Sequence, residues 1–163
     1  MKEIRKNNYS PDVLELMALL YKNKVEYLIV GGQAVIYYGH VRLTGDIDFL
    51  YNQTEKNVDK LYITLLEFWN NDIPGLHDKN ELMEKNVIFQ FGAVPNRIDL
   101  ISKIEAVNFK GAWQKREIVK INTGNEILEV YFIDAENLIK NKETLKREKD
   151  LDDLKYLKQI KLK

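Results

Sequence analysis

The sequence contains no cysteine, which excludes disulfide bonds, thiolate metal sites and thiol catalysis. Its two histidines, His40 and His77, have no partner at the spacing of metal ligands. No apolar run approaches the roughly 20 residues that cross a membrane. The 25 basic and 25 acidic side chains cancel, so no overall field draws the protein to nucleic acid or to a membrane. These absences predict a soluble, cytoplasmic protein without membrane partners.

At 163 residues, the chain is long enough for one domain with a substantial core, and we expect a single domain over residues 1–163. A basic helical segment is expected at about residues 134–163. Residues 140–163 hold nine basic and five acidic side chains, a net charge of +4. Most of these charges fit a solvated helix face. The functional alternative is that Arg147 and Lys149 turn toward phosphate groups.

Apolar spacing predicts an α/β (α+β) fold, a mixed sheet with helices mainly on one face and acidic side chains on the other. The predicted strands are residues 27–30, 46–50, 87–91, 97–101, 117–121 and 126–133. Helices are predicted after four capping residues, Ser10, Thr54, Asp134 and Thr144, and at residues 33–38.

A glycine pair follows the first of these strands. Tyr27–Val30 is a short apolar run, and Gly31 and Gly32 end it with a turn that lets another group approach the backbone closely. The helix expected at residues 33–38 follows directly. A strand-to-helix turn opened by glycines is a common phosphate site, because the first amides of a helix are unpaired.

Two carboxylates alternate in the next strand. Asp46 and Asp48 share one face of a strand, while Ile47 and Phe49 point to the other face and into a core. Unpaired carboxylates held side by side repel each other unless a cation lies between them. This pattern therefore predicts a hard divalent metal ion.

A third carboxylate, Asp99, has the same setting between Ile98 and Leu100. If its strand pairs beside the strand of Asp46 and Asp48, three oxygen ligands lie on adjacent strands. Such a set could hold two Mg²⁺ at the ~3.5–4 Å separation that in-line phosphoryl chemistry uses.

These features belong to a longer string: Gly31-Gly32, Ala34, Gly39, Arg42, Thr44, Asp46-Ile47-Asp48 and, later, Ile98-Asp99-Leu100. The string resembles the signature of the polymerase-β-like nucleotidyltransferase superfamily. Its first part looks like the small bacterial stand-alone branch, which includes toxin–antitoxin nucleotidyltransferases. The resemblance covers roughly residues 25–102, with a looser likeness at residues 147–154.

The resemblance implies transfer of a nucleoside monophosphate from an NTP to an acceptor hydroxyl, with Mg²⁺ (or Mn²⁺) as cofactor and pyrophosphate as product. In that reading Asp46, Asp48 and Asp99 are the catalytic and metal-binding residues, and Asp99 takes the proton of the attacking hydroxyl. The acceptor could be a tRNA end, a protein hydroxyl or a small molecule such as an aminoglycoside. A toxin or antitoxin protein is a further candidate partner.

Nucleotide binding is assigned to five residues: Gly31, Gly32, Arg42, Thr44 and Lys149. Arg42 and Thr44 have an alternative role, since both could brace the loop instead of binding phosphate. His40 is a candidate cleft residue because it lies in the loop before Asp46. The rival hypothesis is a nucleotidyltransferase-like fold kept as an antitoxin or interaction module with little or no transfer activity; the three carboxylates favour the enzyme.

Overall fold

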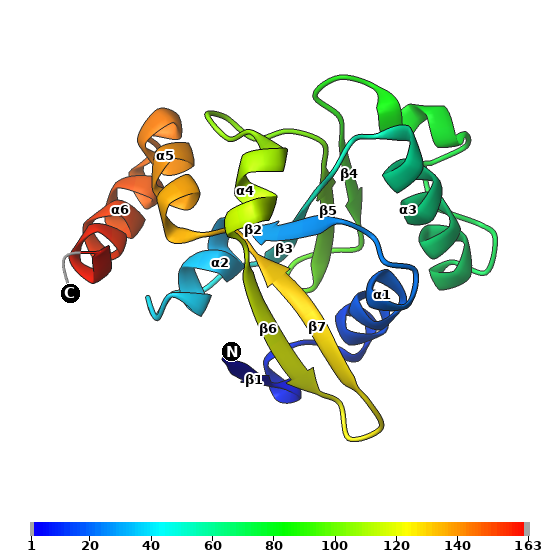
Figure 1. Ribbon diagram of the computed structural model, residues 1–163, viewed down its shortest axis with the longest axis horizontal. Helices are drawn as coiled ribbons and strands as arrows, with labels where there is room; N and C mark the ends of the chain where they lie inside the picture. Colours follow the sequence, from blue (N-terminus) through cyan, green and yellow to red (C-terminus); the bar gives the residue numbers. More distant parts are fainter. Residues whose placement is uncertain (1, 162–163) are drawn as a thin grey trace.

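A computed structural model of the protein describes residues 2–161. Met1, Leu162 and Lys163 lie outside the described residues, so the end of the predicted basic segment does as well. The described strands form a seven-stranded mixed sheet in the order β1-β6-β7-β2-β3-β5-β4 (Figure 1). Their bounds are β1 Glu3–Arg5, β2 Tyr27–Val30, β3 Asp46–Tyr51, β4 Ile88–Phe91, β5 Arg97–Ile101, β6 Glu117–Asn122 and β7 Ile127–Phe132.

Six α-helices accompany the sheet within residues 2–161: α1 Pro11–Lys22, α2 Gly31–Tyr37, α3 Glu55–Phe68, α4 Phe109–Lys115, α5 Ala135–Leu145 and α6 Glu148–Lys161. Two short 3₁₀ helices, η1 Lys6–Asn8 and η2 Lys79–Met83, connect elements. Helices α1 and α3 pack against each other at one end of the molecule, and α5 and α6 pair at the opposite end (Figure 1). The predicted α/β (α+β) fold with a mixed sheet is confirmed.

Three of the four predicted helix caps are confirmed by hydrogen bonds. The side chains of Ser10, Thr54 and Asp134 each accept from a backbone N–H three residues ahead. The prediction for Thr144 was wrong, because α5 continues through it and its hydroxyl donates to the carbonyl of Lys140.

The last helix begins later than predicted. Lys146 takes a left-handed conformation with φ +51°, which ends α5 and turns the chain. Asp150 then accepts a hydrogen bond from the backbone N–H of Arg147 at 3.1 Å, so an acid inside α6 organises its start. Strand β1 and helix α4, which are only three and seven residues long, were also not predicted from the sequence.

The central strands place the acidic side chains. All four residues of β2 are buried, and in β3 Ile47 and Phe49 are buried while Asp46 and Asp48 are only partly covered. Strand β3 pairs antiparallel with β2 and parallel with β5. Among residues 2–161, no helix is both long enough and apolar enough to cross a membrane.

Candidate metal and nucleotide site

Three carboxylates converge where β3 and β5 pair. Asp48 lies opposite Asp99 in the parallel register, and Asp46 lies two residues earlier on the same face of β3. One carboxylate oxygen of each residue lies within 4.8 Å of those of the other two. Asp99 is buried, with 4% of its surface exposed. We call these three residues the carboxylate site; their oxygens are the ligands that hard divalent cations prefer.

Arg97 compensates part of this negative charge. Its Nη2 lies 2.8 Å from Asp46 Oδ2, and its Nε lies 2.9 Å from Asp99 Oδ1. Gln90 Nε2 also donates to Asp99 Oδ2 at 3.3 Å. Asp48 accepts no hydrogen bond from Arg97 among the described residues, so the third carboxylate lacks a paired cation.

The consequence for Asp48 is a raised pKa. Burial is the largest cause, followed by the charges of Asp46 and Asp99 and a hydrogen bond with Asp99; together they raise the pKa of Asp48 to about 7, against the opposing effect of Arg97. The ionised form of Asp48 is unfavourable because no positive charge of the described chain is paired with it. A cation bound beside Asp48 would therefore stabilise this form.

Arg97 is a site residue that was not assigned from the sequence. Its contact with Asp99 follows from strand alternation, since residues two apart share a face. That signal was available in the sequence. Its contact with Asp46, 51 positions away, depends on the pairing of β3 with β5, which sets Asp46 opposite Arg97.

The glycine pair allows the start of α2 to contact the site. Gly31 has φ +65°, and a Cβ there would overlap the carboxylate of Asp48. A Cβ on Gly32 would lie 2.6 Å from Thr44 Oγ1 and 2.9 Å from Arg42 Nη2. Any larger side chain at either position would push these groups away. The structure thus brings Gly31, Gly32, Arg42 and Thr44 to the edge of the carboxylate site.

Thr44 braces Asp46. Its hydroxyl lies 3.1 Å from Asp46 Oδ1 and 3.4 Å from the backbone oxygen of Asp46. The hydroxyl has one proton, so one of these oxygens receives it at a time. This contact corresponds to the bracing role that the sequence left open for Thr44.

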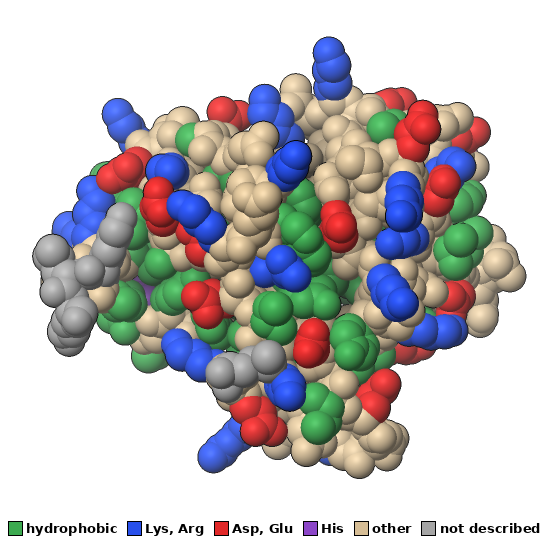
Figure 2. All heavy atoms as spheres, in the orientation of Figure 1, with side chains coloured by type: hydrophobic (Ala, Val, Ile, Leu, Met, Phe, Trp, Pro, Cys, Tyr) green, Lys and Arg blue, Asp and Glu red, His purple; other side chains and the backbone are tan. Residues whose placement is uncertain are grey.

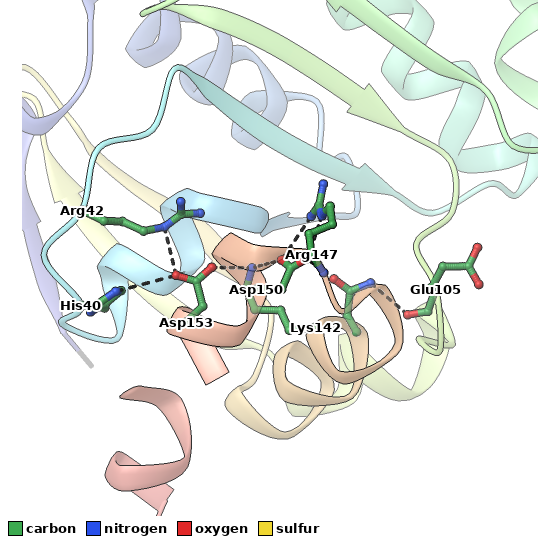
Figure 3. Close-up of polar contacts among 8 residues, drawn as sticks. His40, Arg42, Glu105, Lys142, Arg147, Asp150 and Asp153 are labelled. Atoms are coloured by element: carbon green, nitrogen blue, oxygen red, sulfur yellow. Dashed lines mark hydrogen bonds and ion pairs between the residues drawn. The ribbon is translucent and has the colours of Figure 1, made fainter. Parts of the chain in front are cut away.

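Arg42 connects the loop of residues 38–45 to α6. Its Nε lies 3.2 Å from Asp153 Oδ1, and Nε2 of His40 lies 3.8 Å from the same oxygen (Figure 3). The ring of His40 also contacts Tyr156 of α6, with centroids 4.8 Å apart. His40 therefore lies against α6 rather than against the carboxylate site.

A second charged cluster lies between α5 and α6. Lys142 Nζ, on α5, is 3.1 Å from Asp150 Oδ1 and 2.8 Å from Asp153 Oδ2, and all three side chains are 2% exposed or less. Arg147, whose side chain is about half exposed, completes the cluster from its surface, with Nε 2.7 Å from the buried Asp150 Oδ2. We call these four residues the buried ion network; Figure 3 shows it with Arg42 and His40 on the far side of Asp153.

Asp153 is held by charge more than by hydrogen bonds. Its ion pairs with Arg42 and Lys142 have short distances but are not hydrogen bonds, and neither oxygen accepts a hydrogen bond from residues 2–161. This network was not predicted from the sequence. Its signal was the spacing of Asp150 and Asp153, which puts two acids on one helix face.

Lys149 is the predicted site residue that the structure does not bring to the others. It is exposed on α6 and makes no ion pair or hydrogen bond with any part of the chain that the structure describes. Its neighbour Arg147 is better placed, because the charge of Asp48 contributes to raising the pKa of Arg147, after the larger effect of Asp150.

The family described as "Nucleotidyltransferase of unknown function (DUF6036)" matches residues 12–161 of the chain. The chain belongs to this nucleotidyltransferase family. The matched region contains the carboxylate site, the glycine pair and the buried ion network. No curated protein matches the chain.

Proposed function

We propose that this nucleotidyltransferase moves a nucleoside monophosphate from an NTP to an acceptor hydroxyl and releases pyrophosphate. The observation that carries the proposal is the charge of the carboxylate site: three carboxylates within 4.8 Å, with Arg97 paired to two of them and Asp48 left without a cation. A structural cluster of this kind is normally neutralised by its own neighbours. A site that binds Mg²⁺ or Mn²⁺ needs the opposite, an excess of negative oxygen ligands.

The donor set fits two Mg²⁺ or Mn²⁺ ions as cofactor. Asp46, Asp48 and Asp99 would hold them, and the metal would supply positive charge where the triphosphate and the leaving pyrophosphate are negative. In the transfer step, the acceptor oxygen forms a bond to the α-phosphorus as the bond to the β-phosphate oxygen breaks. Asp99 takes the hydroxyl proton.

The phosphate contacts come from the surrounding residues. Gly31 and Gly32 leave room for a phosphate beside the start of α2, and the guanidinium of Arg42 lies against Gly32. Thr44 keeps Asp46 oriented. Lys149, on the exposed face of α6, reaches the outer phosphates only when nucleotide is bound. Arg147 shares this role because it already lies within electrostatic range of Asp48.

The proposed acceptor is the hydroxyl of a tRNA end or of a protein. The proposed partner is a toxin or antitoxin protein, as in the branch that the sequence resembles. We propose that the protein works as a single domain in the cytoplasm, where its cysteine-free sequence has no need of oxidising conditions.

Label transfer in a cell extract tests the proposed function. The protein is incubated with Mg²⁺ and each α-labelled NTP in turn, and the RNA, protein and small-molecule fractions are counted. We expect one fraction to be labelled. Asp99→Asn should keep most nucleotide binding and lose transfer, because the lost group acts on the attacking oxygen. Asp72→Asn, an exposed aspartate in the loop after α3, is the matched control.

Two results would contradict the enzyme. One is no labelled fraction with any of the four nucleotides. The other is equal label transfer by the parent protein and by Asp99→Asn. If transfer is absent while the protein still binds another protein from its cell, the interaction module is the correct function.

A further inference from the structure

A groove leads from the carboxylate site to the N-terminal segment. Its larger part is a cavity of about 660 Å³ between β1, α2 and the 38–45 loop. Its smaller part, about 180 Å³, reaches Asp46 and Arg97. The two parts adjoin, because they share four lining residues, Asn8, Tyr9, Gln33 and Thr44. We call this the N-terminal groove, and its larger part has the size of typical small-ligand sites. Figure 2 shows the side of the molecule on which the N-terminal segment lies, where basic and acidic side chains are interspersed.

An aromatic ring forms one wall of the groove. One face of Tyr37 stacks on Phe132, with centroids 4.4 Å apart and planes 18° apart. Lys2 Nζ lies 4.9 Å from the centroid of the Tyr37 ring, and because Phe132 covers one face, the ammonium group lies over the other. Lys2 is exposed and its side chain has four rotatable bonds, so a flat ligand can take its place over the ring.

Side-chain amides line the rest of the groove. Gln33 on α2, Asn8 in η1 and Asn96 beside β5 all border it. None of these three amides makes a side-chain hydrogen bond with residues 2–161. Each amide offers two donors and an acceptor, which are the groups that read the edge of a nucleobase.

The charge of the groove is nearly balanced. Lys2 and Arg42 contribute positive charge and Glu3 contributes negative charge, while Arg42 is already paired with Asp153. Ile36 and Leu43 add apolar surface. A groove with an aromatic face, free amides and little net charge suits a flat, polar, uncharged group better than a chain of phosphates.

We infer that the N-terminal groove binds a nucleoside, with the base over Tyr37, its edge against Gln33 and Asn8, and its sugar toward Thr44 and Asp46. This inference rests on the proposed function and adds the recognition of the base to it. The nucleoside has two sources, the NTP itself or the 3′-terminal residue of an RNA acceptor. Both present the same base and ribose to the groove, and both must bring a sugar oxygen or a phosphate to the carboxylate site.

Binding of two probes to the full chain tests the inference. The first probe is each NTP with Mg²⁺, followed by calorimetry. The second is a fluorescein-labelled single-stranded RNA hexamer with a free 3′ hydroxyl, followed by anisotropy. Gln33→Ala should weaken binding of one probe by about 3- to 10-fold, the loss of one or two hydrogen bonds. Gln114→Ala, exposed on α4, is the matched control.

A second variant removes the aromatic wall. Tyr37→Leu should weaken binding of the same probe at least as much as Gln33→Ala does, provided that the circular dichroism spectrum of the variant matches that of the parent. An effect on NTP alone identifies the bound nucleotide as the source, and an effect on RNA alone identifies the acceptor. Unchanged affinity for both probes in a folded Gln33→Ala protein overturns the inference.

The two proposals fail in different ways. If the parent protein transfers label normally and Gln33→Ala changes neither probe, the groove inference is wrong and the proposed function stands. If no label is transferred but Gln33→Ala weakens a probe, the groove binds a nucleoside and the enzymatic proposal is wrong. A third outcome is that Gln33→Ala reduces label transfer to a protein but leaves the affinity for both probes unchanged. This outcome would mean that a peptide occupies the groove, and it also overturns the inference.

Discussion

The 38–45 loop contacts two clusters of aspartates, Asp46 through Thr44 and Asp153 through Arg42, and the charge balance of the two clusters differs. The carboxylate site sets three carboxylates against one guanidinium, that of Arg97. The buried ion network sets two carboxylates against two cations, and Arg42 adds a third. Clustered acids are therefore not equivalent: the carboxylate site keeps an excess of negative charge, as the proposed metal site requires, whereas the buried ion network does not.

Arg42 belongs to both regions. Its guanidinium lies against Gly32 at the carboxylate site, while its Nε is paired with Asp153 in the network. The network is therefore placed to orient the side chain that we propose to bind phosphate. Such an arrangement would favour binding, because an arginine that is already oriented loses less side-chain entropy than a free one.

The largest effect is expected from breaking the buried ion network. Lys142→Met leaves Asp150 and Asp153 buried without the cation between them. Removing one partner of a buried ion pair typically costs about 3–5 kcal/mol of unfolding free energy. We expect a loss of that size in urea unfolding followed by circular dichroism.

The matched control is Lys140→Met on the same helix. Lys140 pairs with Glu136 at 3.0 Å, but both side chains are exposed, so its loss should change the unfolding free energy little. Equal urea midpoints for Lys142→Met and Lys140→Met would show that the network does not stabilise the fold.

The second effect is a pH dependence of the unfolding free energy that Asp48 of the carboxylate site causes. The pKa of Asp48 is raised to about 7 in the folded protein, and an unfolded aspartate has a pKa of about 4. Between these values the folded state binds more protons than the unfolded state, so stability falls as pH rises from about 4 to about 7. Asp48→Asn should remove this fall and stabilise the metal-free protein at pH 8 by up to about 4 kcal/mol, the equivalent of about 3 pKa units.

Urea unfolding at pH 5 and pH 8 in the presence of EDTA measures this difference. Asp72→Asn should behave like the parent at both values. Addition of Mg²⁺ and nucleotide should raise the melting temperature of the parent, because a ligand that binds only the folded state stabilises it. The melting temperature of Asp48→Asn should not rise. If the unfolding free energies of the parent and of Asp48→Asn depend on pH in the same way, the negative charge of Asp48 is already neutralised by neighbouring groups without metal.

The three acids of the carboxylate site could be predicted because their signals are local. Strand alternation alone puts Asp46 and Asp48 on one face, and the buried neighbours of Asp99 place it on a second strand. The pairing that sets Asp48 against Asp99 was only a condition of that prediction, because nothing local in the sequence fixes which strands pair. The pairing of Arg97 with Asp46 needed that register as well, so it was not predicted.

The spacing of Asp150 and Asp153 signals two acids on one helix face, but their buried partner Lys142 could not be predicted because the contact depends on one turn. The left-handed residue Lys146 reverses the chain between α5 and α6, and only that reversal brings Lys142 to Asp150 and Asp153. A lysine in a basic segment otherwise reads as a solvated side chain. The wrong cap at Thr144 has the same origin, since the sequence does not reveal where the turn falls.

A third effect tests the residue that the two regions share. Arg42→Ala should weaken nucleotide binding by about 1.5–3 kcal/mol, the loss of a charge-assisted hydrogen bond to phosphate. Calorimetry with Mg²⁺ and nucleotide measures it. Lys155→Ala, an exposed lysine on α6, is the control. If Arg42→Ala binds nucleotide as the parent does while losing stability, Arg42 only braces the loop against Asp153.

The smallest effect distinguishes two neighbouring cations of α6. Arg147 is held by Asp150 and lies within electrostatic range of Asp48, whereas Lys149 is exposed and has no ion pair with residues 2–161. A side chain that is already oriented loses less entropy on binding phosphate, so Arg147→Ala should weaken nucleotide binding more than Lys149→Ala. We expect the Lys149→Ala loss to stay below about 1 kcal/mol, as for an exposed charge. A larger loss for Lys149→Ala than for Arg147→Ala in the same titration would mean that α6 turns its exposed face toward the nucleotide, and that the buried ion network does not fix the orientation of the helix.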